Sequence, residues 1–273
     1  MNKFNDVLST ATALALRRSD QRRDARTFEA TKHERRLTMR MTTSILFSGL
    51  ILAVATGTGS IALAGGKDYK PHIDPADFQE TVDNPYMPLV PGTIAKFVEK
   101  NGDETSEIEV TVMHDTKMVM GVKCTVVHDK MTEKGVLKED TYDWYAQRKD
   151  GTVWYFGEDT KEFKSGGRVS TKGSWEAGIN GCQPGIMMPA HPKPGEPYRQ
   201  EYGRDVAEDM GQVVATDETV AVPAGTYKDC VKTKDWSMLE AGHEFKWYAK
   251  GVGVVKETAT AGDVATLISI THE

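Results

Sequence analysis

Residues 140–159, DTYDWYAQRKDGTVWYFGED, restrict the fold more than any other stretch of the chain. Two aromatic-rich runs flank the step Asp150-Gly151, and an Asp-Gly step between such runs is a strong signal for a β-hairpin. In the first run Asp143 and Trp144 point to opposite faces, because side chains alternate along a strand. The second run, VWYF, is apolar or aromatic at every step, as in a strand that is covered on both faces. We therefore expect this hairpin at the centre of a β-sheet.

After Pro91 the chain repeats a pattern of short strands and tight turns. The strand-like segments are residues 93–100, 104–113, 117–130, 161–164, 168–172, 226–236, 243–249 and 264–270. Helix signals are confined to residues 74–79 and to one turn at residues 205–210. This spacing predicts an all-β fold, namely an antiparallel curved sheet that is a half-barrel or barrel-like, with a sandwich as the alternative.

Alternation within these segments predicts which aromatic side chains enter the core. In residues 243–249, Phe245, Trp247 and Ala249 share one side of the strand and are expected to point inward. Trp144 and Trp154 of the hairpin are expected in the interior with them.

An export signal occupies residues 39–64 rather than the start of the sequence. Residues 39–41 supply a basic n-region, residues 45–55 are apolar, and Ala-Leu-Ala at residues 62–64 is an A-x-A cleavage site. A transmembrane anchor and an uncleaved tail are the alternatives, but Gly57 ends the apolar run below the roughly 20 residues that a spanning helix needs. We expect cleavage near Ala64 and a periplasmic or secreted protein without a transmembrane anchor.

The cleavage site also defines the domain organisation. Residues 1–38 precede the expected start of translation, and residues 65–90 lead into a single β domain at residues 91–273. Residues 1–64 hold 10 Lys and Arg and 5 Asp and Glu, so the mature chain keeps 24 basic and 35 acidic residues and a net charge of −11. This charge disfavours nucleic acid and anionic membranes as partners, and it suits a soluble exported protein or one that attracts cations.

The three cysteines leave the redox state open. Export permits a disulfide, and Cys124 and Cys230 both lie in strand-like runs whereas Cys182 lies in a loop. A Cys124–Cys230 disulfide is therefore favoured, with three reduced and packed cysteines as the alternative.

Residues 173–198 form the least regular part of the domain. Five of the 11 prolines lie there, together with apolar residues such as Trp175 and Ile186. A proline-rich segment with this apolar content indicates an ordered loop rather than disorder. We expect one long irregular loop that caps one end of the sheet and carries whatever activity the protein has.

The same loop contains soft donor atoms. The candidate metal ligands, which suit Cu(I), are Cys182, Met187, Met188 and His191. Cys182 and His191 are also a possible nucleophile and base. The plain alternative is that the methionines fill the core and His191 is solvated.

Acidic and aromatic side chains around the hairpin supply two more candidate sites. Paired carboxylates of a hydrolase, or oxygen ligands of calcium, would come from Asp140, Asp143, Glu158 and Glu176. A ligand would be held by Tyr142, Trp144, Tyr155, Trp175, Met187 and Met188. The plain alternatives are a solvated acidic rim and an ordinary core. The chain has no G-x-S-x-G elbow, Walker loop, Rossmann glycine pattern or CxxC, which favours a protein that is not an enzyme.

Six segments carry a resemblance to known proteins: DNPYMPLVPGT at residues 83–93, DTYDWYAQ at 140–147, VWYFGEDTKE at 153–162, GSWEAG at 173–178, PYRQEY at 197–202 and YAKGVGVVKE at 248–257. Together they resemble a secreted bacterial family of unknown role, which implies export and supplies no catalytic residues. VPAGTYKDC at residues 222–230 is more loosely similar to exported half-barrel proteins of the lipoprotein-carrier type. That similarity implies a curved sheet around an apolar ligand groove.

These observations favour an exported, soluble, non-catalytic binding protein without a cofactor. It would hold a small or apolar ligand, or a partner, against the curved sheet. The alternatives are a carboxylate-dependent hydrolase or lyase acting on a polysaccharide-like polymer, and a periplasmic protein that binds copper or calcium. The sequence leaves the oligomeric state open.

The export signal predicts the first residue of the mature protein. Because the A-x-A site ends at Ala64, N-terminal sequencing of the exported protein should begin at Gly65. A mature chain that starts upstream of Ile45 would contradict this prediction.

Overall fold

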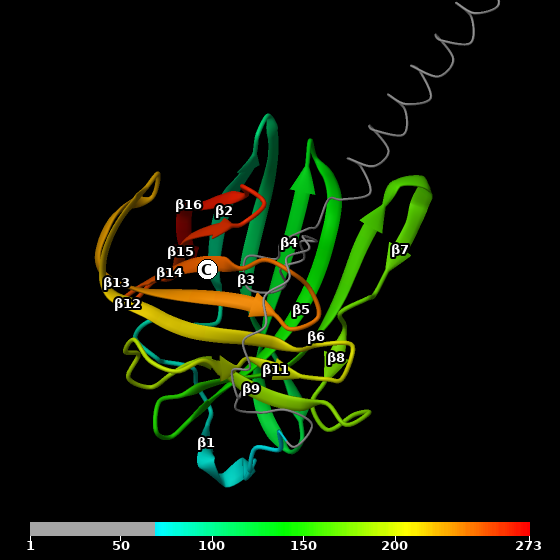
Figure 1. Cartoon of the computed structure of the whole chain (residues 1–273), viewed down its shortest axis with the longest axis vertical. Helices are drawn as coiled ribbons and strands as arrows, with labels where there is room; N and C mark the ends of the chain where they lie inside the picture. Colours follow the sequence, from blue (N-terminus) through cyan, green and yellow to red (C-terminus); the bar gives the residue numbers. More distant parts are fainter. Residues whose placement is uncertain (1–68) are drawn as a thin grey trace, which may run out of the picture. The chain divides into compact units, whose positions relative to one another are not determined.

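Strands make up most of the chain that the structure describes. The computed structural model describes residues 69–273, of which 65% are in strands and 3% in helix. The sheet is antiparallel and nearly closes into a barrel with one unsealed seam (Figure 1). The all-β, barrel-like prediction is confirmed. The expected signal peptide and the residues before it lie outside the described range.

The described residues belong to one compact unit with two short 3-10 helices and sixteen strands. In chain order these elements are η1 (Pro75–Asp77), β1 (Phe78–Gln79), β2 (Thr93–Asn101), β3 (Glu104–Val119), β4 (Val122–Glu133), β5 (Val136–Arg148), β6 (Val153–Lys164), η2 (Ser165–Gly167), β7 (Arg168–Ser170), β8 (Trp175–Glu176), β9 (Gln183–Met188), β10 (Tyr198–Arg199), β11 (Glu201–Tyr202), β12 (Asp209–Val222), β13 (Gly225–Ser237), β14 (Glu244–Ala249), β15 (Gly253–Ala259) and β16 (Val264–His272). The central hairpin forms as predicted, between β5 and β6.

Two meanders build most of the sheet. Strands β2 to β6 pair in chain order, and so do β12 to β16. The last strand then lies beside the first of these, because β16 pairs with β2 and places Leu267 opposite Phe97. Both side chains are buried in the core, so apolar contact holds the two meanders together along this line.

One residue connects the two ends of the sheet. β10 pairs with β12 at one end and β11 pairs with β9 at the other, and only Gln200 separates β10 from β11. The backbone N–H of Gln200 donates to the carbonyl of Asp209 at 2.9 Å, and its side-chain Nε2 lies 3.6 Å from Met187 Sδ. Gln200 is buried, so the chain crosses the seam inside the protein rather than over its surface.

Two glycines make room for this crossing. A Cβ on Gly211 would lie 2.8 Å from Tyr198 Cε2 and 2.9 Å from Gln200 Nε2. A Cβ on Gly185 would overlap the backbone of Gln200. Neither glycine has a positive φ, so these positions require space and not an unusual backbone conformation.

The predicted facing of β14 is wrong. Phe245 and Trp247 were expected to point inward, but Lys246 does so and lies 3.5 Å from Asp235 Oδ2. Trp247 is buried on the outer side, where the Nζ atoms of Lys232 and Lys256 lie 4.7 and 5.1 Å from its ring centre. Long lysine stems can cover an aromatic ring while their ammonium groups stay in water, so burial of Trp247 does not require the core.

Three further segments differ from expectation. Residues 205–210 contain no helix, and β12 begins at Asp209 instead. The loop at residues 173–198 contributes β8 and β9 to the sheet, both paired with β6, so part of it extends the sheet. β15 (Gly253–Ala259) was not predicted, because its glycine-rich start reads as a turn.

The favoured disulfide is absent. Cys124, Cys182 and Cys230 are all free and buried, and none lies at bonding distance from another. Cys124 belongs to β4 and Cys230 to β13, and five strands lie between them in the order of the sheet. Both cysteines do lie in strands, as predicted, but the order of the strands places the two residues too far apart to form a disulfide.

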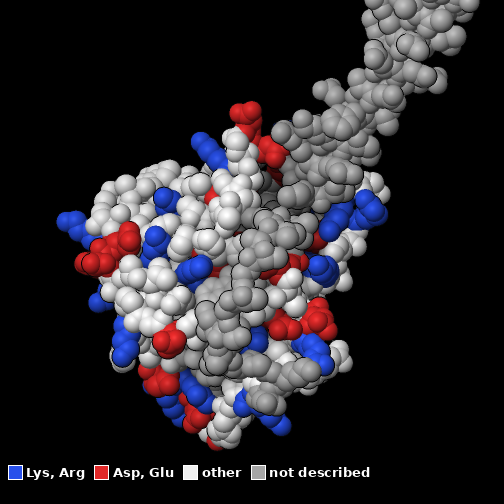
Figure 2. All heavy atoms as spheres, in the orientation of Figure 1, with Lys and Arg blue, Asp and Glu red and all other residues white. Residues whose placement is uncertain are grey.

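The outer side of the sheet is charged and ion-paired. Glu109 on β3 lies between Lys96 of β2 and Lys130 of β4, with Nζ to carboxylate distances of 3.2 and 3.1 Å. Acidic and basic side chains are intermixed over the face seen in Figure 2. Within residues 69–273, no helix is long and apolar enough to cross a membrane.

The close approach at the seam predicts a stability effect. Gly211→Ala and Gly185→Ala should each lower the free energy of unfolding by about 1–3 kcal/mol, because the added methyl group overpacks the Gln200 crossing. Urea unfolding followed by tryptophan fluorescence measures this. Gly195→Ala is the matched control, because a Cβ there would meet only an ordinary contact at 3.6 Å. Equal stability of all three variants would contradict the proposed packing.

Candidate binding site inside the barrel

The described part of the chain buries an unusual number of acidic side chains. Nine Asp and Glu residues are buried, against only two basic residues, Arg199 and Lys246. The acidic residues are Glu99, Asp129, Glu139, Asp143, Glu158, Glu201, Asp235, Glu244 and Glu257. Burial of a charge is unfavourable unless it is paired or neutralised, so this set requires an explanation beyond solubility.

Strand register brings these residues onto one face. Asp143 of β5 lies opposite Glu158 of β6. Asp235 of β13 lies opposite Glu244 of β14, and Lys246 of β14 lies opposite Glu257 of β15. Directly paired residues share a face of the sheet, so both meanders turn carboxyl groups to the same side.

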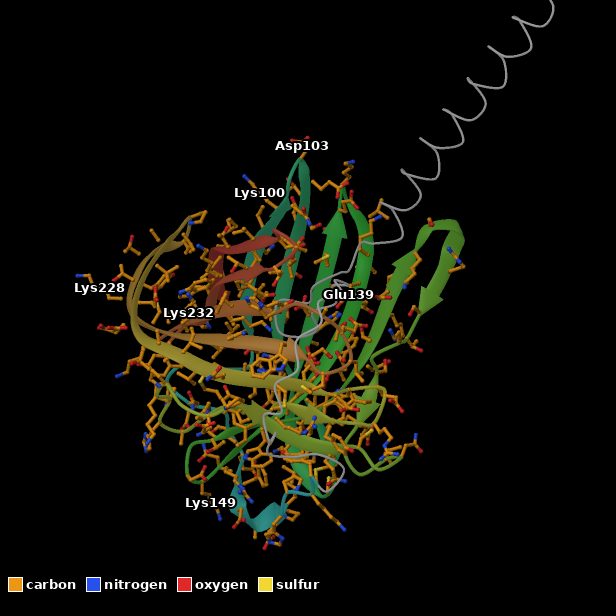
Figure 3. The ribbon with its side chains drawn as sticks, in the orientation of Figure 1. Lys100, Asp103, Glu139, Lys149, Lys228 and Lys232 are labelled. Atoms are coloured by element: carbon orange, nitrogen blue, oxygen red, sulfur yellow. The ribbon has the colours of Figure 1, made fainter. Side chains whose placement is uncertain are left out.

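That side is the interior. Burial raises the pKa of Glu99 on β2 to about 8, and Asp263, Glu244 on β14, Glu139 on β5 and Asp129 on β4 add to the effect. Carboxyl groups of β2, β4, β5 and β14 are therefore close enough to influence one another, as expected if they face a common interior. Figure 3 labels Glu139 of β5 and Lys232 of β13 among the side chains of the sheet.

Lys246 is held as a cation within the acidic set. Its Nζ lies 3.5 Å from Asp235 Oδ2 and 3.6 Å from Glu244 Oε2. Burial lowers the pKa of Lys246, but Glu257, Asp235 and Glu244 outweigh it and hold the pKa well above its usual value. One ammonium group therefore compensates part of the acidic charge on β13 to β15.

Farther along the interior, carboxyl groups retain protons instead. Burial raises the pKa of Asp143 to about 8, although a hydrogen bond from Tyr155 lowers it. Burial also raises the pKa of Glu158 and of Glu201 well above its usual range, and each is raised further by neighbouring carboxylates. With a pKa of about 8, Asp143 is largely protonated at neutral pH, which reduces the cost of burying it.

Several buried carboxyl oxygens have no hydrogen-bond partner. Within residues 69–273 these atoms are Asp143 Oδ2, Asp235 Oδ1, Glu244 Oε1 and Glu257 Oε2. The other oxygen of Asp143 accepts a hydrogen bond from Tyr155 Oη at 2.8 Å, so the side chain is fixed while one oxygen is unsatisfied. An unsatisfied buried polar atom costs about 1–3 kcal/mol, which favours a site that a polar ligand completes.

Aromatic rings line the same part of the interior. Tyr145 and Tyr155 are stacked with ring centres 5.1 Å apart, and Trp175 stands edge-on to Tyr155 at 5.2 Å and 86°. The indole of Trp175 is close to Glu201 and lowers its pKa, which offsets part of the effect of burial. Rings and carboxyl groups therefore meet at β5, β6, β8 and β11.

The structure divides the predicted ligand-binding residues between two faces. Tyr155, Trp175 and Met187 lie in the interior, where Met187 contacts Gln200. Met188 is also buried, on β9 opposite Val153. Tyr142 and Trp144 lie on the outer face of β5, opposite to Asp143, and Trp144 is buried there.

On that outer face Tyr142 stacks on His128, with ring centres 4.1 Å apart. Lys117 Nζ lies 3.3 Å from the ring centre of Trp144. Both rings therefore already contact a neighbouring side chain.

The predicted carboxylates are divided in the same way. Asp143 and Glu158 are brought together inside the barrel. Asp140 lies on the outer face, 2.6 Å from His128 Nε2, and Glu176 is ion-paired to Lys117 at 2.7 Å. The period of two along a strand already separates Asp140 from Asp143, and this signal was present in the sequence.

The proposed copper ligands occupy different environments. Cys182 is buried against Gly203, whereas His191 is exposed at the surface. Across residues 69–273, no group of three or more His, Cys, Asp or Glu side chains is arranged to hold a metal ion.

Sequence reasoning missed the centre of the acidic set. Lys246, Asp235, Glu244 and Glu257 were not selected, although a lysine between two aromatic residues of a strand is visible as FKW. The role of Lys246 as the cation of the acidic set becomes apparent only from the strand register, which places Glu257 directly opposite it.

The fold and the site together define an antiparallel, barrel-shaped β protein with an acid-lined interior. No family model and no curated protein matches the chain. Among solved structures it is similar to a protein from Bacteroides fragilis, inferred to be exported and described as having a YmcC-like fold. The two share 14% identity with a TM-score of 0.40, over 68% of this chain and 98% of the other. At this TM-score the similarity carries no argument, and the fold rests on the strand pairing described above.

The raised carboxyl pKa values predict an unusual pH dependence of stability. The pKa of Asp143 is about 8 in the folded chain and about 3.9 in an unfolded chain. The folded state therefore holds more protons than the unfolded state, and stability should fall as the pH rises between these values. Each such proton contributes a slope of up to about 1.4 kcal/mol per pH unit.

Urea unfolding from pH 5 to pH 7.5 measures this slope. Asp143→Asn should flatten it, whereas Asp159→Asn, which alters a largely exposed carboxylate, should leave it unchanged. Stability that increases through this window would contradict the assignment.

Proposed function

We propose that the protein is an exported, non-catalytic binding protein that holds a small polar ligand inside the barrel. The observation that carries this proposal is the set of four unpartnered carboxyl oxygens on β5, β13, β14 and β15. A polar ligand would supply the hydrogen-bond donors that these oxygens lack. Export is supported by the signal at residues 39–64.

An apolar ligand fits this interior poorly. Contact with hydrocarbon would leave one carboxyl oxygen each of Asp143, Asp235 and Glu257 buried without a donor, and burying polar atoms in that way is unfavourable. The expected ligand class therefore changes from small or apolar to small and polar.

Hydrolysis of a polymer is also less well supported than binding. Asp143 and Glu158 face each other across β5 and β6, but their side chains are 0% and 6% exposed. A polymer would have to reach carboxyl groups inside a nearly closed sheet. A small molecule requires much less space, and so binding is the better-supported function.

Native mass spectrometry of the protein purified from exporting cells tests this proposal. A retained small molecule should appear at one copy per chain, and titration calorimetry with that molecule should show affinity at least about tenfold weaker in Asp143→Asn and in Glu257→Gln. Asp159→Asn is the control and should bind as the unaltered protein does. Absence of any retained molecule, or equal affinity in all variants, would contradict the proposal. Release of sugars from a polysaccharide panel, abolished by Asp143→Asn, would favour the hydrolase instead.

A further inference from the structure

The outer face of β13, β14, β15, β16 and β2 carries two adjacent rows of side chains with four lysines and no acidic residue. The register places in the first row Lys232, Trp247, Lys256, Thr266 and Val98. It places in the second row Lys234, Phe245, Thr258, Val264 and Lys100. We call these ten residues the outer band. On the same strands, the interior side carries Asp235, Glu244, Glu257 and Glu99, all buried.

The lysines of the outer band have no acidic partner. Within residues 69–273, no carboxylate is ion-paired to Lys100, Lys232, Lys234 or Lys256. Elsewhere on the outer face lysines are neutralised, as where Lys96 and Lys130 share Glu109 at 3.2 and 3.1 Å. An acidic chain therefore presents a local positive surface. Exposed charges farther away than about 8 Å are largely screened from it at physiological ionic strength.

Trp247 positions two of these ammonium groups. It lies between Lys232 and Lys256 in the first row, and their Nζ atoms lie 4.7 and 5.1 Å from its ring centre. Trp247 is only 8% exposed, so a ligand on this face meets the ammonium groups rather than the indole. Lys232 also lies 4.5 Å from the ring centre of Phe245. Side chains held in this way lose less conformational freedom when they bind an anion.

The lysines recur at every second strand of this face. Lys232 and Lys234 belong to β13, Lys256 to β15 and Lys100 to β2, in the strand order β13-β14-β15-β16-β2. Because neighbouring strands lie about 4.8 Å apart, positive charges are spaced about 10 Å apart over a length of about 19 Å. Figure 3 labels Lys232 and Lys100, which belong to the first and last strands of the outer band.

This spacing matches one kind of extended anionic chain. In an extended peptide, side chains on one face recur about every 6.8 Å, which is shorter than the spacing of the lysines. In a ribbon of 1,4-linked sugar rings, successive rings face opposite ways. Carboxylates on one side of such a ribbon recur at every second ring, which is about two strand spacings.

Two uncharged groups of the outer band also suit a sugar chain. Thr258 and Thr266 carry hydroxyl groups that have no hydrogen-bond partner within the described residues, so they are available to sugar hydroxyls. An anionic bilayer fits this face less well, because Trp247 is covered by lysines and cannot insert among lipids.

We propose that the outer band binds a linear anionic polysaccharide, whose carboxylates contact the four lysines. The chain would lie across the strands, with its charged groups at β13, β15 and β2. This site lies on the opposite face of the sheet from the interior site and is independent of the proposed function.

Two oligosaccharides that share a backbone test this inference, namely β-1,4-linked oligomannuronate and β-1,4-linked oligomannose. Both are chosen long enough to span the outer band, about 19 Å, and only the first carries carboxylates. Calorimetry with the exported protein should show oligomannuronate binding at least about tenfold more tightly. Its affinity should fall at least about tenfold when NaCl is raised from 50 to 500 mM, because the contacts join exposed charges.

Lysine variants locate the site. Lys232→Gln and Lys256→Gln should each weaken oligomannuronate binding at least about threefold, and the double variant at least about tenfold. Lys149→Gln is the matched control, because it removes the same charge from the turn between β5 and β6, at the bottom of Figure 3, and it should bind as the unaltered protein does.

Equal affinity for the two oligosaccharides, or affinity that neither lysine variant changes, would overturn the inference. Tighter binding of poly-L-glutamate or of phosphatidylglycerol vesicles than of oligomannuronate would also overturn it, in favour of a peptide or a membrane. If the lysine variants do not fold, the comparison of the two oligosaccharides and the salt dependence decide. The proposed function is tested separately, because Lys232→Gln should retain the small molecule inside the barrel and Asp143→Asn should retain oligomannuronate binding.

Discussion

Closure of the sheet at Gln200 is the constraint on which the interior depends. Two strands of two residues each, β10 and β11, bring the ends of the sheet to either side of this residue. Gly185 and Gly211 allow the approach because a side chain at either position would overlap it. Without the Gln200 crossing, more water would enter through the unsealed seam and the pKa values of the acidic side chains would return toward ordinary ranges. The electrostatic properties of the site therefore follow from a packing contact.

The negative charge of the buried carboxyl groups is reduced in two ways. Around β13 to β15 the interior uses a protein cation, because Lys246 is surrounded by Asp235, Glu244 and Glu257. Around β5, β6 and β11 it uses protons, because burial raises the pKa of Asp143, Glu158 and Glu201. A bound proton can be exchanged for a ligand, whereas the side chain of Lys246 is a permanent part of the protein. The carboxyl groups around β13 to β15 are therefore a structural centre, and those around β5, β6 and β11 are suited to reversible binding.

Local sequence patterns predict the structural features that depend on residues close together in the chain. The hairpin of residues 140–159 and the β-rich architecture follow from turn chemistry and period-two alternation, and the structure contains both. Asp143 and Glu158 were among the residues singled out because they belong to that hairpin.

The rest of the site depends on contacts that no local pattern encodes. Glu201 approaches Trp175 because β11 pairs with β9, and β9 and β8 both pair with β6. For β14, hydrophobicity favours Phe245 and Trp247 as the inward residues, and the opposite facing is decided by Glu257 and Asp235 on the neighbouring strands. The predicted Cys124–Cys230 disulfide was wrong for the same reason. A local pattern can place a cysteine in a strand, but it does not tell which other strand lies beside that strand.

The pairing of β16 with β2 has a consequence for how the chain acquires its structure. Each meander consists of hairpins between consecutive strands, so each can form while the chain is still growing. Their union requires residues 264–272 to meet residues 93–101. The enclosed interior therefore forms only after β16 has been synthesised. Until then the acidic side chains remain hydrated and charged, and their mutual repulsion opposes early collapse of the growing chain.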